Sequence, residues 1–94
     1  GVYVVALVNV KNEDKMKEYG QIAGGTLSKY GAKITAKGKV EGVLVGEDNL
    51  NVLAVMEFPS IKQIDAWYSS EEYQAAISVR NEACDMTILK VVVP

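Results

Sequence analysis

Two runs of the chain are apolar at both odd and even positions, and this feature most limits the folds open to it. They are Val2–Val10 (VYVVALVNV) and Leu50–Phe58 (LNVLAVMEF). A strand with one face in water alternates apolar and polar residues, whereas a run apolar on both parities is typical of a strand covered on both faces. The two runs therefore predict a β-sheet with a covering layer on each side.

A helical pattern follows the first run. Apolar residues recur at steps of three and four, which is one face of a helix: Met16, Tyr19, Ala23, Leu27 and Tyr30. Asn12 or Asp14 can cap the start of this helix, and Gly31 stands where it is expected to stop.

The next segment predicts an edge strand and a turn. Residues 33–40 alternate, with Lys33, Thr35, Lys37 and Lys39 on one side and Ile34, Ala36, Gly38 and Val40 on the other. Exposed lysines suit the edge of a sheet. Gly42 and Gly46 then bracket VLV, a candidate for one more short strand, and GEDN after it signals a turn.

Helix signals follow the second apolar run. Pro59 ends that strand, and Ser60 with Gln63 has the spacing of a capping box. The residues SSEE at 69–72 offer a second cap, so we expect two helical segments with a break at the serines, the second ending at about Cys84 or Asp85. MTILKVVV, residues 86–93, is the expected last strand.

The resulting order is β, α, β, (β), β, α, β over residues 1–94, read as a single domain. It predicts an α+β fold, the ferredoxin-like split βαβ sandwich, with an antiparallel sheet and both helices on one face. Since the strands are apolar on both parities, the other face also needs a cover. A second copy of the same sheet is the simplest one, so we expect a homodimer whose sheets pack face to face.

Composition narrows the function. The 94 residues carry a net charge of −2, which argues against nucleic acid and against anionic membranes as partners. The chain has no histidine, so sites built on histidine for zinc, haem or general-base catalysis are excluded. The one cysteine, Cys84, allows no internal disulfide, sits on an apolar stripe, and reads as a small core residue. We expect a cytoplasmic protein with no metal or cofactor.

Three stretches strongly resemble the domain of unknown function 1330 family. They are EYGQIAGGTLSKYGAKITAKG, AVMEFPSIKQIDAWYSSEEYQAAISVRNEA and the terminal TILKVVV, so the resemblance covers essentially the whole chain. It implies a dimeric α/β-barrel fold and no established activity. The wider fold group implied by this resemblance contains cofactor-free monooxygenases, lactone isomerases and haem-dependent enzymes, but a shared fold does not determine function.

Arg80 is the first candidate for chemistry. Tyr73, Ile77, Arg80 and Cys84 fall at steps of four, three and four, on one helix face that should pack on the sheet. Arg80 either clamps an anion or carbonyl in a pocket between helix and sheet, or is structural, and we favour the structural role. Its expected partner is Glu57, which we favour as half of an ion pair over a general base.

The tyrosines and glycines supply further candidates. Tyr73 is the third candidate catalytic residue, since a tyrosine hydroxyl in an apolar pocket can orient a carbonyl; Tyr19, Tyr30 and Tyr68 are alternatives, and any of them can instead be a core anchor. We expect Trp67 to anchor the dimer. Gly20 and Gly24, one helical turn apart, predict a close approach by a strand, a partner helix or a ligand ring.

Two classes of function remain open. The first is a cofactor-independent enzyme or binder of a small organic acid or aromatic metabolite, with its pocket between helices and sheet. The second is a non-catalytic dimeric interaction domain, which predicts no enclosed pocket. A pairing of Arg80 with Glu57 and no cavity beside them would exclude the first.

Overall fold

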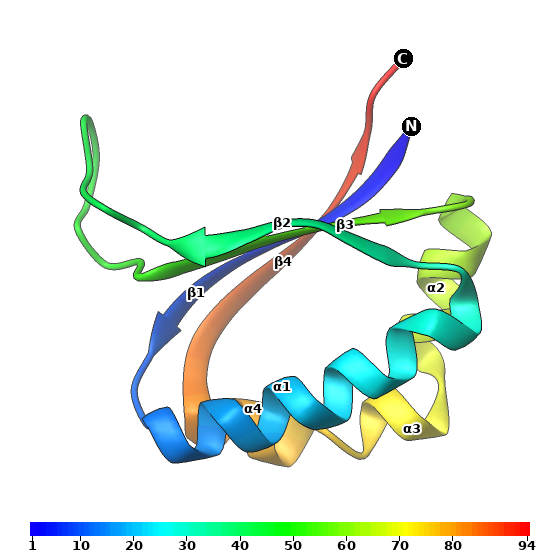
Figure 1. Ribbon diagram of the computed structural model, residues 1–94, viewed down its shortest axis with the longest axis horizontal. Coiled ribbons are helices and arrows are strands. Elements are labelled where there is room, and N and C mark those ends of the chain that lie inside the picture. Colours follow the sequence, from blue (N-terminus) through cyan, green and yellow to red (C-terminus); the bar gives the residue numbers. More distant parts are fainter.

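The computed structural model describes all 94 residues as one sheet with helices on one face (Figure 1). The strands are β1 (Val2–Val10), β2 (Lys33–Lys39), β3 (Val52–Phe58) and β4 (Cys84–Val92). The helices are α1 (Glu13–Leu27), a 3-10 turn η1 (Ser28–Tyr30), α2 (Ile61–Ser69), α3 (Glu71–Gln74) and α4 (Ile77–Ala83). The sheet is antiparallel with strand order β2-β3-β1-β4. This confirms the α+β, ferredoxin-like prediction.

Side-chain caps set the helix ends. The side chains of Asn12, Ser60 and Ser70 accept hydrogen bonds from backbone N–H groups at the starts of α1, α2 and α3. Gly31 ends the first helical region with φ 74°, a left-handed conformation that favours glycine. A β-carbon there would also lie only 2.7 Å from the Pro59 ring.

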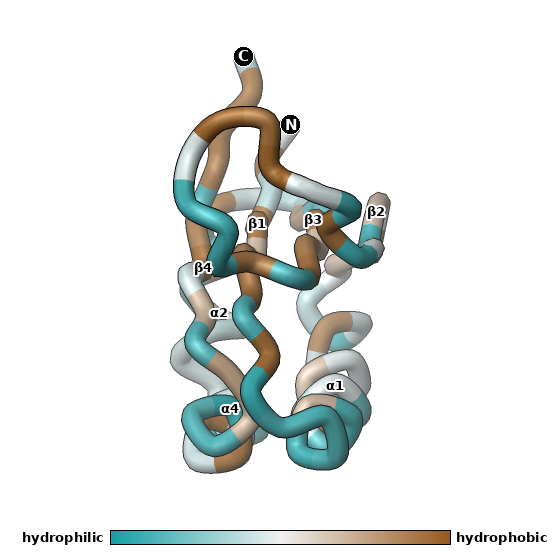
Figure 2. Tube along the Cα trace, turned by 90° about the vertical axis from the view of Figure 1, so that its left-hand side faces the viewer, coloured by the Kyte–Doolittle hydropathy of each residue, from teal (hydrophilic) through white to brown (hydrophobic).

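Two local predictions were wrong. The region after Ser70 is divided again at Ala75–Ala76, so it forms α3 and α4 rather than one helix. The VLV segment is part of a loop over residues 40–51 and makes no strand, because no strand lies beside it to pair with. Leu44 and Val45 are almost fully exposed in this loop, which rises on the helix-free side of the sheet and forms an apolar tip (Figures 1 and 2).

A β-bulge in the edge strand β2 changes which face of the sheet its side chains point to. Ile34 pairs with Met56 but Ala36 pairs with Val55, so the register shifts by one residue between them. Such a shift moves every later side chain to the opposite face of the sheet. Lys37 and Lys39 therefore share the helix-covered face with Ile34, which corrects the simple alternation expected from the sequence.

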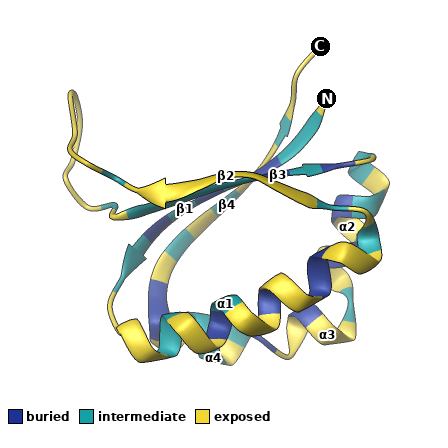
Figure 3. Cartoon of the chain, viewed as in Figure 1, coloured by how far each residue is buried: buried dark blue, intermediate teal, exposed yellow.

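The core lies between helices and sheet (Figure 3). Val4, Ala6 and Val8 of β1 point into it, and Tyr73 and Ala76 are fully buried. Trp67 is only 3% exposed and its Nε1 donates to Thr26 Oγ1 at 2.9 Å, so it is a core residue and not the dimer anchor we expected. No helix is both long enough and apolar enough to cross a membrane.

Candidate functional site

Arg80 lies on α4 with its guanidinium among tyrosines. Its Nη1 donates to the Tyr73 hydroxyl at 3.0 Å and contacts the Tyr68 hydroxyl at 3.4 Å. The guanidinium carbon also lies 6.0 Å from the centre of the Tyr73 ring, at the outer range of a cation–π contact. Tyr73 lies on α3 and Arg80 on α4, so the contact spans the break between these two short helices.

The hydroxyl of Tyr73 connects Arg80 to side chains in the core. It lies 2.8 Å from the Tyr19 hydroxyl, which in turn lies 4.0 Å from the sulfur of Met86. If Tyr19 donates to the sulfur, Tyr73 must donate to Tyr19, which leaves the Tyr73 oxygen to accept from Arg80. Each tyrosine hydroxyl hydrogen in this chain then has an acceptor, and the chain reaches from α4 through α3 and α1 to β4.

The surroundings keep Arg80 and Tyr19 protonated. Burial would lower the pKa of the Arg80 guanidinium, but its contacts with the Tyr68 and Tyr73 hydroxyls outweigh burial and raise it above its ordinary value. Burial first, and then the Tyr73 hydrogen bond, raise the pKa of Tyr19 well above its usual range. The site therefore presents a permanent cation and a neutral phenol.

A recess of about 370 Å³ opens beside Arg80. Its walls come from β1, α2, α4 and β4 and are mainly apolar: Val4, Ile64, Trp67, Tyr68, Met86 and Ile88. Asp65 and Lys90 stand at its rim, and they are joined by an ion pair of 3.0 Å. Arg80 is thus the one charged group of this recess without an oppositely charged partner.

Glu57 does not meet Arg80, which corrects the expected ion pair. Its strand neighbours Met56 and Phe58 are buried under the helices, so Glu57 points to the helix-free face, where Lys33 of β2 lies directly across from it. It lines a separate recess at the end of the sheet. The sheet therefore separates Glu57 from Arg80, and no carboxylate lies within 4.0 Å of the guanidinium.

Sequence reasoning brought Arg80 and Tyr73 together on one face but did not choose among the other tyrosines. Tyr68 follows Trp67 in the sequence, and the sequence pattern suggests an exposed residue there. Nothing in the pattern indicated a contact between Tyr68 and Arg80. Tyr19 stood on the apolar stripe of the first helix. That stripe was the available signal, since a tyrosine buried there needs a partner for its hydroxyl.

Comparisons with known proteins agree with the fold. A protein of unknown function from Rhodopseudomonas palustris is 18% identical, with a TM-score of 0.85 over 99% of this chain and 83% of its own. A dimeric ferredoxin-like protein of unknown function from Jannaschia sp. CCS1 is 14% identical, with a TM-score of 0.78 over 98% of each chain. SnoaB, a cofactor-independent oxygenase from Streptomyces nogalater, is 8% identical, with a TM-score of 0.69 over 99% of this chain and 92% of its own.

No curated protein matches the chain in sequence. The model of the family described as Domain of unknown function (DUF1330), however, matches residues 1–93, nearly the full length. This agrees with the resemblance carried by the EFPS, WYSSEEYQAA and VRNEA motifs. The chain belongs to the DUF1330 family.

Proposed function

We propose that the protein is a homodimer that binds a small organic acid in the recess beside Arg80. The observation that carries the proposal is the state of Arg80: a guanidinium that is half-buried, held only by neutral phenols, and without a carboxylate within 4.0 Å. A partly buried charge without a counter-ion is unfavourable, and a ligand carboxylate relieves it. The planar guanidinium also suits a carboxylate, because it can donate two parallel hydrogen bonds.

The recess walls indicate the rest of the ligand. They are aliphatic and aromatic apart from the paired Asp65 and Lys90, so the body of the acid is apolar and an aromatic ring is well accommodated. The recess lies between helices and sheet, as expected for a small-molecule site. Its presence, with Arg80 free of Glu57, favours a ligand-binding protein over a purely non-catalytic interaction domain.

The chemistry available at Arg80 is stabilisation of negative charge on an oxygen atom. Arg80 can donate hydrogen bonds to a carboxylate in the recess, and the hydroxyl of Tyr68, which lines the same recess and accepts from Arg80, can donate another. SnoaB, which has a similar fold, is described as a cofactor-independent oxygenase, and this supports catalysis without a cofactor in this architecture. A general-base role for Glu57 has no place in this proposal, because its carboxylate lies on the other face of the sheet.

The dimer rests on the helix-free face. Half-buried apolar residues line it on the two central strands, namely Val5, Leu7, Leu53 and Val55, and exposed Leu89 continues it on β4. An apolar sheet face without helices needs a cover. Similar structures are described as dimeric ferredoxin-like proteins, which supports a second copy as that cover.

The test uses benzoate as the probe and benzamide as its uncharged counterpart. Binding is measured by changes in the amide chemical shifts of the protein. We expect benzoate to change the shifts of residues around Trp67 and Met86, and benzamide to bind far more weakly. Loss of a hydrogen bond to a charged group costs about 1.5–3 kcal/mol, so Arg80→Gln should weaken benzoate binding by roughly 10- to 150-fold.

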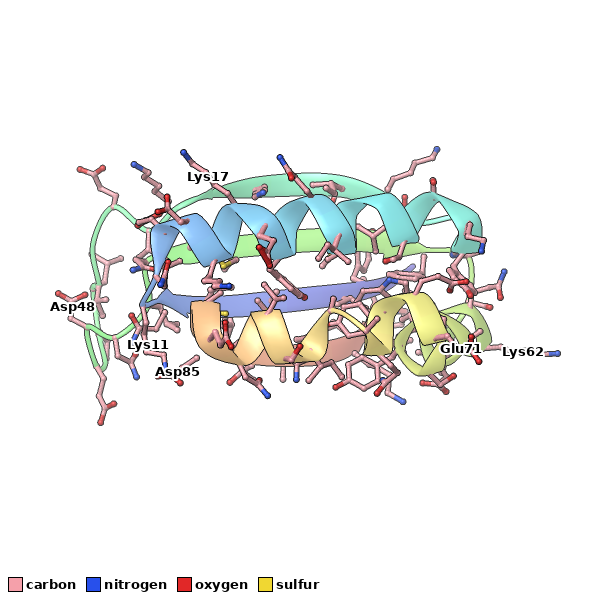
Figure 4. The ribbon with its side chains drawn as sticks, turned by 90° about the horizontal axis from the view of Figure 1, so that it is seen from below. Lys11, Lys17, Asp48, Lys62, Glu71 and Asp85 are labelled. Atoms are coloured by element: carbon pink, nitrogen blue, oxygen red, sulfur yellow. The ribbon has the colours of Figure 1, made fainter.

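Lys62→Gln is the matched control. It removes the same charge from a side chain that has no carboxylate within 4.0 Å and points away from the protein at the start of α2 (Figure 4). It should leave benzoate binding unchanged. Equal binding of benzoate and benzamide, or an unchanged affinity in Arg80→Gln, would contradict the proposal.

A further inference from the structure

The largest opening of the protein lies between α1 and β2, at the edge of the sheet opposite to β4 and Arg80. Its volume is about 700 Å³, which is within the range of roughly 300–1,000 Å³ that is typical of small-molecule sites. The opening shares no wall residue with the recess beside Arg80. A ligand bound here would therefore occupy a site of its own.

Three lysines without an acid partner line this opening. They are Lys17 from α1 and Lys37 and Lys39 from β2. None of them has a carboxylate within 4.0 Å, and the ion pairs of the protein all use other lysines. Glu13 is the one acid among the wall residues. Positive charge is thus in excess at this opening, although the chain as a whole carries a net charge of −2.

The fold directs these lysines to one place from two elements. After the β-bulge, Lys37 and Lys39 pair with residues of β3 that pack on the core, so both lysines point to the helix side of the sheet. Lys17 extends from α1 on this same β2 side, away from α4 (Figure 4). Lysines on an edge strand also discourage pairing with another sheet. That role does not explain an unpaired lysine on the helix, whereas a shared anion explains all three.

The rest of the opening combines apolar and amide side chains. Val10, Met16 and Val52 form an apolar floor, and Gln21 and Asn51 are the uncharged polar residues. The Oδ1 atom of Asn51 accepts from the backbone N–H of Val10 at 2.9 Å, so its amide nitrogen is left to donate to a ligand. The walls therefore suit a ligand that is anionic at one end and apolar at the other.

Gly20 leaves the α1 side of the opening without a side chain. A β-carbon at Gly20 or at Gly24 would meet no atom within 4 Å, so the strand or helix contact expected at these glycines is absent from the chain. Gly20 lines the opening, where the backbone of α1 is accessible. A ligand is the remaining partner among those expected at Gly20.

The charge of the opening fits a phosphate monoester better than a carboxylate. A phosphate monoester carries a charge of about −1.5 to −2 at pH 7, and lysine ammonium groups bind phosphate as point charges. A carboxylate carries a single charge and is matched best by a planar guanidinium such as that of Arg80. The apolar floor favours an ester with an apolar group over inorganic phosphate.

We propose that this opening is a second ligand site, which binds a phosphate monoester with a compact apolar group. The phosphate lies among Lys17, Lys37 and Lys39, and the apolar group packs on the floor of the opening. The site is independent of the proposed function at Arg80, since the two share no residue. Lys37 and Lys39 do not lie on the helix-free face, so a dimer formed there leaves the opening accessible.

The test compares three probes by isothermal titration calorimetry at about pH 8, where a phosphate monoester is doubly charged. Phenyl phosphate should bind about 2- to 5-fold more tightly than phenyl sulfate, which has the same shape and one negative charge. It should also bind more tightly than inorganic phosphate, which has no apolar group. Equal affinity for phenyl phosphate and either of the other probes would overturn the proposal.

Substitutions of the lysines test the site directly. Lys37→Gln/Lys39→Gln removes two solvent-exposed contacts and should weaken phenyl phosphate binding by about 2- to 30-fold. Lys17→Gln removes one and should weaken it by about 2- to 5-fold. All three side chains are exposed, so the variants should fold as the wild-type protein does. Unchanged affinity in the double variant would overturn the proposal.

Lys33→Gln/Lys62→Gln is the matched control. It removes the same total charge from two exposed lysines that have no ion pair and line neither this opening nor the recess beside Arg80. It should bind phenyl phosphate as the wild-type protein does. Equal losses in this control and in Lys37→Gln/Lys39→Gln would show attraction to the overall charge alone, and would overturn the proposal.

Amide chemical shifts distinguish this site from the one at Arg80. Phenyl phosphate should change the shifts of residues around Gly20 and Val52, whereas benzoate should change those around Trp67 and Met86. If phenyl phosphate changes only the shifts around Trp67 and Met86, the second site is wrong and the Arg80 site stands. If benzoate fails its test and phenyl phosphate meets its own, the Arg80 site is wrong and the second site stands.

Discussion

Removing the Tyr73 hydroxyl measures how much the hydrogen bonds of the site contribute to the free energy of unfolding. It accepts from Arg80 at 3.0 Å and lies 2.8 Å from the Tyr19 hydroxyl, in a side chain that is fully buried. Tyr73→Phe removes a charge-assisted bond worth about 1.5–3 kcal/mol and a neutral one worth about 1 kcal/mol. Arg80 is partly exposed and water replaces part of its bond, so we expect a loss of about 2–3 kcal/mol in the free energy of unfolding.

A double-substitution cycle sharpens this expectation. Tyr19→Phe removes the neutral bond with Tyr73 and the weak contact with the Met86 sulfur, and should cost about 1 kcal/mol. Tyr73→Phe additionally leaves the buried Tyr19 hydroxyl with only the Met86 sulfur, 4.0 Å away. Removing both hydroxyls removes that unsatisfied group, so the double variant should cost less than the sum of the two single variants, by about 0.5–1 kcal/mol.

Urea unfolding followed by tryptophan fluorescence is the assay. Trp67 is the single tryptophan of the chain, and its ring lies 4.5 Å from that of Tyr73, centre to centre. The transition midpoint should fall while its slope stays unchanged. Protein concentration is held constant, because association contributes to the apparent stability of a dimer. A Tyr73→Phe variant that loses no more stability than Tyr19→Phe, or strict additivity in the cycle, would refute the hydrogen-bond chain.

Two further predictions concern pH and assembly. The pKa of Tyr19 is raised in the folded state, so the unfolded state loses that proton first and the free energy of unfolding should fall as the pH rises above about 10. In Tyr19→Phe the urea midpoint should fall less steeply over that range. An equal fall in the two proteins would contradict the raised pKa. Sedimentation should give twice the mass of the chain at micromolar concentration, and Leu7→Glu, on the helix-free face, should give a folded monomer; a wild-type monomer would contradict the dimer.

The local structure followed from local signals in the sequence. Ser60 and Gln63 marked the start of α2, Pro59 and Gly31 marked ends, and valine-rich runs marked the strands. Each of these effects acts within a few residues, through a cap, a fixed φ angle or a side-chain period, so no tertiary information was needed. The order of the elements was then sufficient to predict the antiparallel sheet.

The site was decided by contacts between residues far apart in the sequence. Glu57 and Arg80 had the charges of a pair, but strand parity placed them on opposite faces of the sheet. Trp67 looked like an interface residue until Thr26, 41 positions away, supplied its hydrogen-bond partner inside the core.

One inserted residue near Thr35 decided where the lysines of β2 point, and no feature of the alternating run indicated it. Burial and side-chain partners depend on which elements pack together, whereas helix ends and strand periods do not. By itself, then, the sequence determined the family, the order of elements and the candidacy of Arg80 and Tyr73. Only the tertiary structure gave Arg80 its tyrosine partners and placed a mainly apolar recess beside it.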